Sequence, residues 1–391
     1  MHTMLGVRSV REYDESSLED QLAWISHCIH NPESVSSEEI GRCIDFLRDN
    51  VSLVLPSDSG NDLKLEDDVY FSTLFSEFNN VPFPQPVSPR FRYIDLFAGI
   101  GGIRLPFHEL GGKCVFSSEW DKAAKTTYFS NFGEIPFGDI AKIPSETIPS
   151  HDILLAGFPC QAFSIMGKMK GFEDTRGTMF FEVARILEHH RPRAILLENV
   201  KQLVSHDGGK TFSVIMDALL RLGYHVKWKV LNALDFGVPQ KRERVIIVGF
   251  TDKEKCDGFN FEFDSKPYDL ASVIEDDEYV DHKLYASADI CKKRQDRVKG
   301  KNLFYPSVWH ENKAGNISVL PYACALRTGA SYNYLLINGV RRPSSRELLR
   351  FQGFPEKYRI AVSHSEIRRQ TGNSVAVPMI RAVAERIVDL L

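Results

Sequence analysis

Between residues 93 and 250, short apolar segments alternate with amphipathic ones, and few folds can accommodate this alternation. Short apolar runs bounded by glycine or polar residues are typical of buried strands, whereas apolar residues at helical spacing indicate helices. Strands that alternate with helices form a mainly parallel sheet with helices on both faces. The sequence therefore predicts an α/β fold with strands at residues 93–97, 114–118, 153–156, 194–198, 226–231 and 245–250.

The first 90 residues differ from the rest of the chain in charge. They contain 6 basic and 16 acidic residues, a net charge of −10, whereas the remainder contains 42 basic and 36 acidic residues, a net charge of +6. The mildly basic remainder is compatible with a nucleic-acid partner, although charge alone does not identify one.

Helical patterns in the acidic region predict a small helical extension. Apolar residues recur at helical spacing in residues 16–30, the capping-box pattern Ser36-x-x-Glu39 predicts the start of a second helix, and residues 69–78 fit a third. The prolines of residues 81–89 exclude a helix and indicate a linker. A helix-turn-helix regulatory module is an alternative, but the acidity of the region and the absence of a turn glycine favour an accessory domain.

The alternating pattern ends after residue 250. Residues 251–340 show no regular pattern and contain a basic run at 292–301 and scattered aromatic residues, and helical patterns return near residues 344–351 and at the C-terminus. We therefore expect four parts: a helical extension with its linker at 1–90, a main domain at 91–250, a smaller domain at 251–343, and a segment at 344–391 that returns to the main domain.

Cysteine spacing and hydropathy exclude several classes of protein. The seven cysteines include no Cys-x-x-Cys pair, so the sequence predicts neither a structural zinc site nor a disulfide framework, and we expect no metal. No apolar run approaches the roughly 18 residues that a membrane helix needs, and the first residues lack the pattern of a signal peptide. We expect a protein of a reducing cytoplasm without a membrane partner.

A glycine turn after the first predicted strand indicates a nucleotide or nucleoside ligand. Glycines at 99 and 101 let the backbone approach a ligand closely, but their spacing does not match the dinucleotide-binding pattern. Glu119 ends the second predicted strand, where its carboxylate could accept both ribose hydroxyls, and the indole of Trp120 could stack on adenine. A ribose–adenine ligand without a pyrophosphate favours S-adenosylmethionine over NAD. A surface acid beside a core indole is an equally good interpretation of this pair.

Polar residues at two further strand ends predict a reactive site. Cys160 follows the strand at 153–156 and Glu198 ends the strand at 194–198, so both open on the same edge of a parallel sheet. A lone cysteine is usually an inert core thiol, but a desolvated carboxylate is costly and indicates a function. Alternation along residues 240–244 places Arg242 and Arg244 on one side of their strand, although a solvated strand end would have the same pattern.

Six segments, in this order, resemble the motifs of the DNA cytosine-5 methyltransferases. They are residues 95–102, 157–164, 198–200, 240–244, 346–355 and 372–375. The resemblance extends from about Tyr93 to the C-terminus, with the exception of residues 251–340, and excludes the first 90 residues. It implies the Rossmann-like sheet of class I S-adenosylmethionine-dependent methyltransferases, with residues 251–343 as a target-recognition domain.

The resemblance also implies a role for each candidate residue. Cys160 corresponds to the nucleophile that adds to cytosine C6, Glu198 to the acid at N3 and the exocyclic amine, and Arg244, with Arg242 as second choice, to the cation near O2. The candidate cofactor-binding residues are Phe97, Gly99, Gly101, Glu119, Trp120, Asp139 and Asn373. The target base must leave the duplex to reach this site, and residues 165–177 resemble the loop that closes over it.

The implied partner is a specific sequence in double-stranded DNA, methylated by a monomer that is paired with a restriction endonuclease. A transfer-RNA cytosine-5 methyltransferase is an alternative, but the Cys-Phe-Thr signature of that branch is absent. A non-enzymatic DNA-binding regulator is another, but it would be expected to lack Cys160 or Glu198. A Rossmann oxidoreductase disagrees with the glycine spacing.

Overall fold

The computed structural model describes residues 18–32, 35–36, 38, 41–42, 78–159 and 179–391. Its centre is a six-stranded sheet in the order β2-β1-β3-β4-β7-β5. The strands are β1 (Phe91–Leu96), β2 (Gly112–Ser118), β3 (Ile153–Ala156), β4 (Ala194–Val200), β5 (His225–Asn232) and β7 (Glu243–Phe250). All six predicted strands are therefore confirmed, several with one or more additional residues.

Strand direction agrees with the predicted mainly parallel sheet. β2, β1, β3 and β4 are mutually parallel, so their carboxyl ends meet at one edge. Within this sheet β7 is antiparallel to both β4 and β5. The start of β7 therefore lies beside the end of β4, and Val200 pairs with Arg244. This reversal brings the predicted arginine pair to the edge where Glu198 lies.

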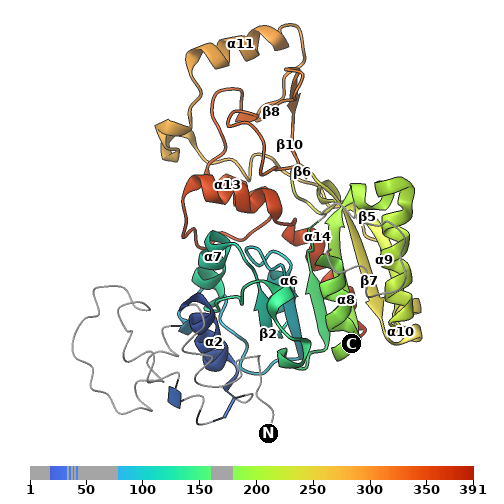
Figure 1. Ribbon diagram of the computed structural model, residues 1–391. Helices are drawn as coiled ribbons and strands as arrows, with labels where there is room; N and C mark the ends of the chain where they lie inside the picture. Colours follow the sequence, from blue (N-terminus) through green and yellow to red (C-terminus); the bar gives the residue numbers. More distant parts are fainter. Residues whose placement is uncertain (1–17, 33–34, 37, 39–40, 43–77, 160–178) are drawn as a thin grey trace, which may run out of the picture.

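Helices cover both faces of the sheet, as the alternation predicts (Figure 1). α8 (Met179–His190) and α9 (Lys210–Arg221) pack on one face, against alternate residues such as Leu154, Ile195 and Ile247. α14 (Val377–Asp389) packs on the other face with Phe107 of α6 (Arg104–Glu109), against the intervening residues of the same strands. Successive residues of each strand thus face opposite sides of the sheet, so one apolar core lies on each face. α7 (Lys122–Phe132) follows β2.

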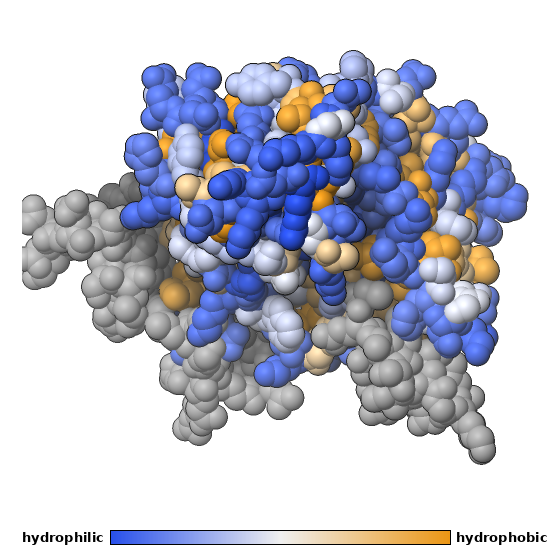
Figure 2. All heavy atoms as spheres, turned by 90° about the horizontal axis from the view of Figure 1, so that it is seen from above, coloured by the Kyte–Doolittle hydropathy of each residue, from blue (hydrophilic) through white to orange (hydrophobic). Residues whose placement is uncertain are grey.

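The region from 251 to 340 is more regular than the sequence predicts. It contains α10 (Lys253–Gly258), α11 (Ala288–Val298) and the strands β8 (Val308–Glu311), β9 (Ile317–Leu320), β10 (Ala323–Cys324) and β11 (Leu335–Ile337). β11, β8 and β9 form a separate small antiparallel sheet. Most of the basic run lies on α11, whose Lys292 and Lys293 are exposed. From above, the surface over this small domain is mainly hydrophilic (Figure 2).

Short contacts join the small domain to the main sheet. β10 pairs in parallel with β6 (Gln240–Lys241), the strand that immediately precedes β7. The buried Gln240 side chain accepts a hydrogen bond from Leu326 N at 3.0 Å. The chain then continues through α12 (Ser345–Arg350) and α13 (His364–Asn373) into α14. α12 and α14 agree with the sequence, whereas α13 was not predicted.

In the acidic extension, α2 (Leu18–His30) confirms the first predicted helix. The Ser36–Glu39 capping box and the second and third predicted helices extend outside the described residues. Residues 81–90 contain no helix, as expected for a proline-spaced linker. In the described part of the chain, no helix is long and apolar enough to cross a membrane.

Candidate active site

A pocket of about 1020 Å³ opens at the carboxyl ends of β1, β2, β3 and β4. Nine of the eleven candidate residues contribute to its wall: Phe97, Gly99, Glu119, Trp120, Asp139, Glu198, Arg242, Arg244 and Asn373. Cys160 and the candidate loop at 165–177 lie outside the described residues, although Pro159, which precedes Cys160, also lines the pocket. The structure therefore brings together candidate residues from six separate parts of the sequence.

Gly101 is the described candidate that lies outside this wall. Its φ of +76° is in the left-handed region, and a β-carbon there would come 2.4 Å from Phe132 Cε2. Gly99, with φ of +54°, would meet nothing within 4 Å. The turn therefore needs Gly101 for packing against α7, whereas Gly99 leaves room on the pocket side for a ligand.

The carboxylate of Glu119 connects the glycine turn to the start of α7. Its Oε2 accepts a hydrogen bond from Gly99 N and its Oε1 accepts one from Asp121 N, both at 2.8 Å. Burial raises the pKa of Glu119, although these amide donors oppose the shift. A carboxylate fixed at this point has lone pairs left for the hydroxyls of a ribose.

Trp120 is 74% exposed at the pocket, so its indole is not part of the core. The alternative interpretation of Glu119 and Trp120 as a surface acid beside a core indole is therefore wrong. An exposed aromatic face at a pocket lined by a fixed carboxylate suits a flat, apolar ring such as adenine.

A buried charged cluster lies behind the glycine turn and was not predicted. Arg104 donates to Tyr128 Oη at 2.9 Å and to both carboxylate oxygens of Glu134, at 2.8 and 2.6 Å. Tyr128 in turn donates to Asp95 Oδ2 at 3.2 Å, and burial raises the pKa of Asp95 to about 8. The cluster links β1, α6 and α7 beneath the pocket, so it fixes the elements that carry the turn.

Glu198 and Arg244 form a buried ion pair on the other side of the pocket. Glu198 is 7% exposed, and Arg244 Nε lies 2.9 Å from its Oε1. Burial raises the pKa of Glu198, and the positive charges of Arg244 and Arg242 lower it only in part. A carboxyl with a raised pKa retains a proton more readily than an exposed one, so it is suited to general acid chemistry.

The segment before Cys160 packs directly on Glu198 and its neighbour. Asn199 Nδ2 donates to Phe158 O at 2.9 Å. A β-carbon on Gly157 would lie 3.6 Å from Glu198 Oε2. The strand end that precedes the candidate nucleophile therefore lies within contact distance of the candidate acid.

Arg242 has a structural environment that distinguishes it from Arg244. It is 1% exposed and donates to the carbonyls of Leu326, Gly372 and Ser374. Burial and the nearby charge of Arg244 lower its pKa to about 9, so it remains a cation at neutral pH. Arg242 thus joins the small domain and the Asn373 segment to β7, which favours Arg244 as the cation that faces the substrate.

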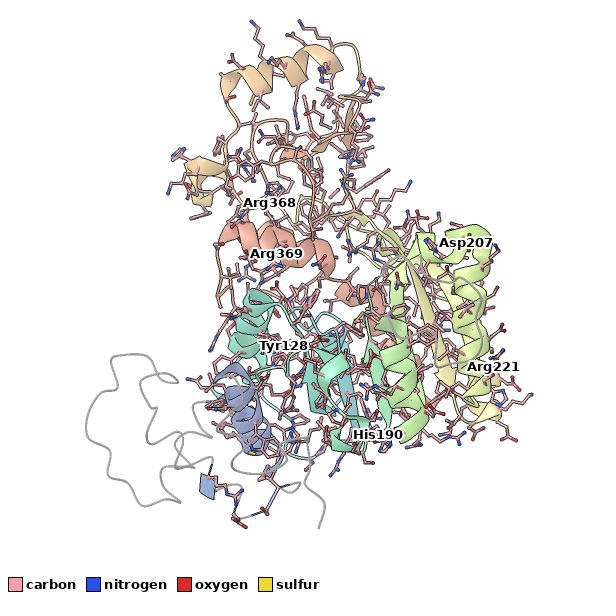
Figure 3. All side chains as sticks on the ribbon, viewed as in Figure 1. Tyr128, His190, Asp207, Arg221, Arg368 and Arg369 are labelled. Atoms are coloured by element: carbon pink, nitrogen blue, oxygen red, sulfur yellow. The ribbon has the colours of Figure 1, made fainter. Side chains whose placement is uncertain are left out.

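Arg369 of α13 also lines the pocket. It donates to both carboxylate oxygens of Asp121, at 2.8 Å to Oδ1, and to Glu366 of its own helix. The Arg369 hydrogen bond lowers the pKa of Asp121, which caps α7 by accepting from Ala124 N. Figure 3 labels Arg369 on α13 below its neighbour Arg368, which lies toward the small sheet. Arg369 was not predicted, because its sequence context shows no motif.

Residues 91–389 match the family of C-5 cytosine-specific DNA methylases. The type II methyltransferase M.HaeII of Haemophilus aegyptius is 55% identical over 304 residues, which cover 77% of this chain and 94% of that protein. M.NgoBI of Neisseria gonorrhoeae is 54% identical over 302 residues, with the same coverage. The chain belongs to the C-5 cytosine-specific DNA methylase family.

Solved structures agree with this methylase in fold. DNMT2 of Spodoptera frugiperda superposes with a TM-score of 0.57 at 19% identity and covers 76% of this chain and 99% of its own. A putative DNA modification methyltransferase encoded within an E. coli prophage has a TM-score of 0.55 at 18% identity, again with 76% coverage of this chain. The expected class I methyltransferase fold is therefore confirmed.

The family membership confirms the predicted activity. The protein is a DNA (cytosine-5-)-methyltransferase, and S-adenosylmethionine supplies the methyl group in this family. The pocket fits that cofactor, since it combines the open turn at Gly99, the fixed carboxylate of Glu119 and the exposed indole of Trp120. Among the described residues, no group of three or more His, Cys, Asp or Glu side chains is placed to hold a metal ion.

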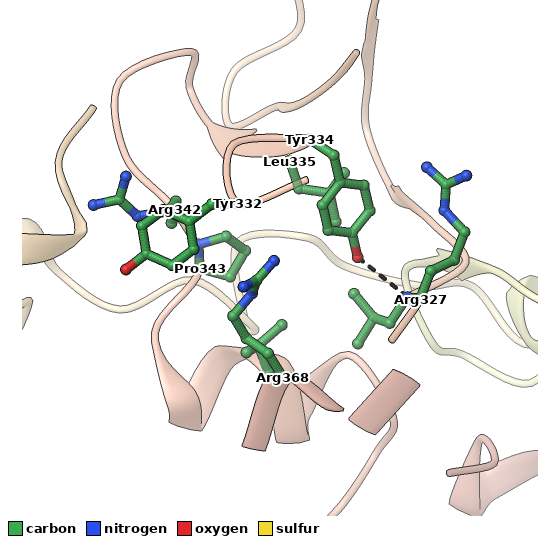
Figure 4. Close-up of a pocket in the computed structure, with 9 residues that line it drawn as sticks. Arg327, Tyr332, Tyr334, Leu335, Arg342, Pro343 and Arg368 are labelled. Carbon is green, nitrogen blue, oxygen red and sulfur yellow. Dashed lines mark hydrogen bonds between the residues drawn. The ribbon is translucent and has the colours of Figure 1, made fainter. Parts of the chain in front are cut away.

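A second cluster of basic and aromatic side chains lies between α13 and the small sheet of this methylase (Figure 4). Arg342 and Arg368 stack on the ring of Tyr332, at 4.1 and 4.9 Å from its centre. Arg327 lies over Tyr334, whose hydroxyl accepts from Arg327 N at 3.3 Å. These arginines add positive charge to the side of the small domain that faces α13.

Proposed function

We propose that this enzyme is the methyltransferase of a type II restriction-modification system and that it methylates cytosine in one specific sequence of duplex DNA. The type II methyltransferases at 55% and 54% identity support this assignment. In this role it acts as a monomer in the bacterial cytoplasm and protects host DNA from a cognate endonuclease. Residues 251–343 form the target-recognition domain and read base edges in the major groove.

We propose that Cys160 is the nucleophile. Its thiolate adds to C6 of a flipped-out cytosine, which places electron density on C5. C5 then takes the methyl group from the sulfonium of S-adenosylmethionine. A base removes the C5 proton, and the bond between Sγ and C6 breaks to release 5-methylcytosine and the thiolate.

Glu198 is the acid for this addition, and the buried Glu198–Arg244 pair is the observation that carries the proposal. A proton held on the carboxyl is donated toward cytosine N3, which makes C6 electrophilic enough for thiolate attack. The raised pKa of Glu198 supports this role. Arg244, adjacent to the same carboxyl, stabilises the negative charge that develops at O2.

The remaining pocket residues hold the cofactor. Glu119 binds the ribose hydroxyls, Trp120 and Phe97 stack on the adenine, and Asp139 accepts a hydrogen bond from its amine. Gly99 allows the backbone to approach the ligand, and Asn373 contacts it from the end of α13. Gly101 supports this set through its packing on Phe132.

A covalent trap tests the mechanism and the substrate together. Duplex DNA that contains 5-fluorocytosine at the target site has no C5 proton to lose, so the enzyme should remain attached to it when S-adenosylmethionine is present. We expect a denaturation-resistant complex in which peptide mapping locates the adduct at Cys160, and no complex with Cys160→Ala. Labelling of transfer RNA, with none of duplex DNA, would overturn the substrate; an adduct at another residue would overturn the nucleophile.

Trp120→Ala is expected to weaken S-adenosylmethionine binding about fivefold without loss of stability. An aromatic stacking contact contributes on the order of 1 kcal/mol, and a 74% exposed side chain contributes little to the core. Equilibrium binding measures the affinity and thermal unfolding the stability. Trp228→Ala, at a 42% exposed indole on β5, is the control and should leave the affinity unchanged. Equal affinities in wild type and Trp120→Ala would exclude adenine stacking.

A further inference from the structure

Helix α2 lies outside residues 91–389, which match the family, and yet it is built into the main core. Every side chain from Ala23 to Asn31 is buried. Trp24, Ile25, Cys28 and Ile29 belong to the same apolar cluster as residues of β1 and β2. A helix that is buried on all sides from Ala23 onward is part of the packed structure, not an appendage.

Two hydrogen bonds connect α2 to the segment that follows α7. Ser26, which is 1% exposed, accepts a hydrogen bond on its Oγ from Ile135 N at 2.9 Å. His30 Nε2 donates to Gly133 O at 2.8 Å, at the left-handed C-cap of α7. The helix is visible against α7 in Figure 1. These bonds fix the backbone at both ends of a three-residue stretch.

The ring of Phe137 extends this contact toward the pocket. It lies 5.9 Å from the ring of His27 and stacks on Phe116 of β2 at 5.1 Å. The Phe137 backbone also pairs with the end of β2, since its N–H donates to Ser117 O at 2.9 Å and its carbonyl accepts from Glu119 N at 2.8 Å. α2 therefore packs on a segment that is aligned with β2.

This segment leads directly into the pocket wall. Gly138, Asp139 and Ile140 all line it. α2 reaches this point as well, because a β-carbon on Gly138 would lie 3.7 Å from Asp20 Oδ1. Along its length, α2 thus contacts the backbone from Gly133 to Gly138, immediately before the carboxylate proposed to bind adenine.

We infer that α2 is a positioning element of the cofactor site, which fixes residues 133–138 so that Asp139 is presented to the adenine of S-adenosylmethionine. The inference rests on the proposed role of Asp139. Ser26 and His30 are positioning residues: they touch neither cofactor nor DNA, and they act through the backbone that they hold. The segment N-terminal to the family domain therefore contributes to cofactor affinity.

Ser26→Ala tests this inference in the full-length enzyme. The change leaves the partly buried Ile135 N–H without its acceptor and loosens the segment, so we expect the dissociation constant and the KM for S-adenosylmethionine to rise roughly fivefold. We expect kcat to stay within about twofold, and the KM for DNA to be unchanged, because the cytosine side of the pocket is untouched. His30→Phe, which removes the other bond but keeps a ring, should have the same effect.

Tyr224→Phe is the matched control. It removes one buried hydrogen bond, from Tyr224 Oη to Pro192 O at 2.9 Å, at the edge of the sheet opposite the pocket. Its effect on thermal stability should resemble that of Ser26→Ala, but cofactor affinity should equal that of wild type. If Ser26→Ala and Tyr224→Phe weaken binding equally, or if neither Ser26→Ala nor His30→Phe weakens it, α2 has no positioning role.

A double-variant cycle separates this inference from the proposed function. Asp139→Ala should weaken S-adenosylmethionine binding, and Ser26→Ala should add little to it, because residues that act through one contact are not additive. An unchanged affinity in Asp139→Ala would refute the proposed role of Asp139. If Asp139→Ala weakens binding and Ser26→Ala weakens it further by the same factor as in the wild type, the proposed role of Asp139 is retained. The positioning role of α2 is then refuted.

Discussion

Glu198→Gln is expected to lower kcat by about 10² to 10⁴, the range that general acid catalysis contributes. Glutamine has nearly the same shape and its amide still donates a hydrogen bond toward cytosine N3, but it cannot transfer a proton. Binding of S-adenosylmethionine should be unchanged, since Glu198 lies across the pocket from Glu119 and Trp120. Single-turnover methyl transfer at saturating DNA and cofactor measures the effect on chemistry directly.

Glu243→Gln is the control for this substitution. Glu243 precedes Arg244 on β7, is partly exposed and pairs with Lys201 at 2.9 Å. The same chemical change at this surface position should leave kcat within about twofold, because exposed ion pairs contribute little. A Glu198→Gln enzyme that keeps more than about a tenth of the wild-type rate would refute general acid catalysis by Glu198.

The pH dependence of kcat/KM provides a second test of the Glu198–Arg244 pair. Activity should fall as pH rises through the raised pKa of Glu198, because the deprotonated carboxylate cannot donate. The positive charge of Arg244 lowers that pKa. In Arg244→Met the alkaline limb should therefore move to higher pH, in addition to an overall loss of rate. A shift to lower pH would contradict the assignment of the limb to Glu198.

The sequence predicted the main sheet well, because most of its strands are largely buried and are bounded by turn residues. Ile153–Ala156 is apolar throughout and lies in the interior of the sheet, between β1 and β4, so its assignment was unambiguous. The small domain was harder. Its strands are two to four residues long and depend on tertiary pairing, so no periodicity could develop within them.

The candidate site was predictable where function requires residues at strand ends, and less so where packing decides. Glu119 and Glu198 were found because a carboxylate at the end of an apolar strand needs an explanation. The role of Gly101 depends on Phe132, and the interpretation of Arg242 depends on three carbonyl groups from distant segments. Neither partner set can be read from spacing in the sequence, since both are made by tertiary contacts.

Arg341→Met is expected to destabilise the protein by about 3–5 kcal/mol, the usual cost of leaving one member of a buried ion pair alone. Arg341 and Glu347 are both fully buried. Their two parallel hydrogen bonds measure 2.9 Å each, and Arg341 also donates to Asp277 at 2.6 Å. The pair joins α12 to the small domain. The midpoint of urea unfolding, with the slope of the transition, measures the loss.

Arg350→Met, at the last residue of α12, is the matched control. Arg350 pairs with Glu356 through bonds of 2.7 and 3.0 Å, but the Glu356 side chain is 64% exposed, so the cost should be about 1 kcal/mol or less. Among the described residues, the Glu347 carboxylate in Arg341→Met keeps only the backbone amides of Glu275 and Ser344 as donors, at 2.8 and 2.7 Å. Adding Glu347→Gln removes that unpaired charge, so the double variant should be more stable than Arg341→Met alone. If the double variant is instead less stable, the buried charge does not cause the loss of stability in Arg341→Met. The lost packing of the Arg341 side chain between α12 and the small domain would then be the cause.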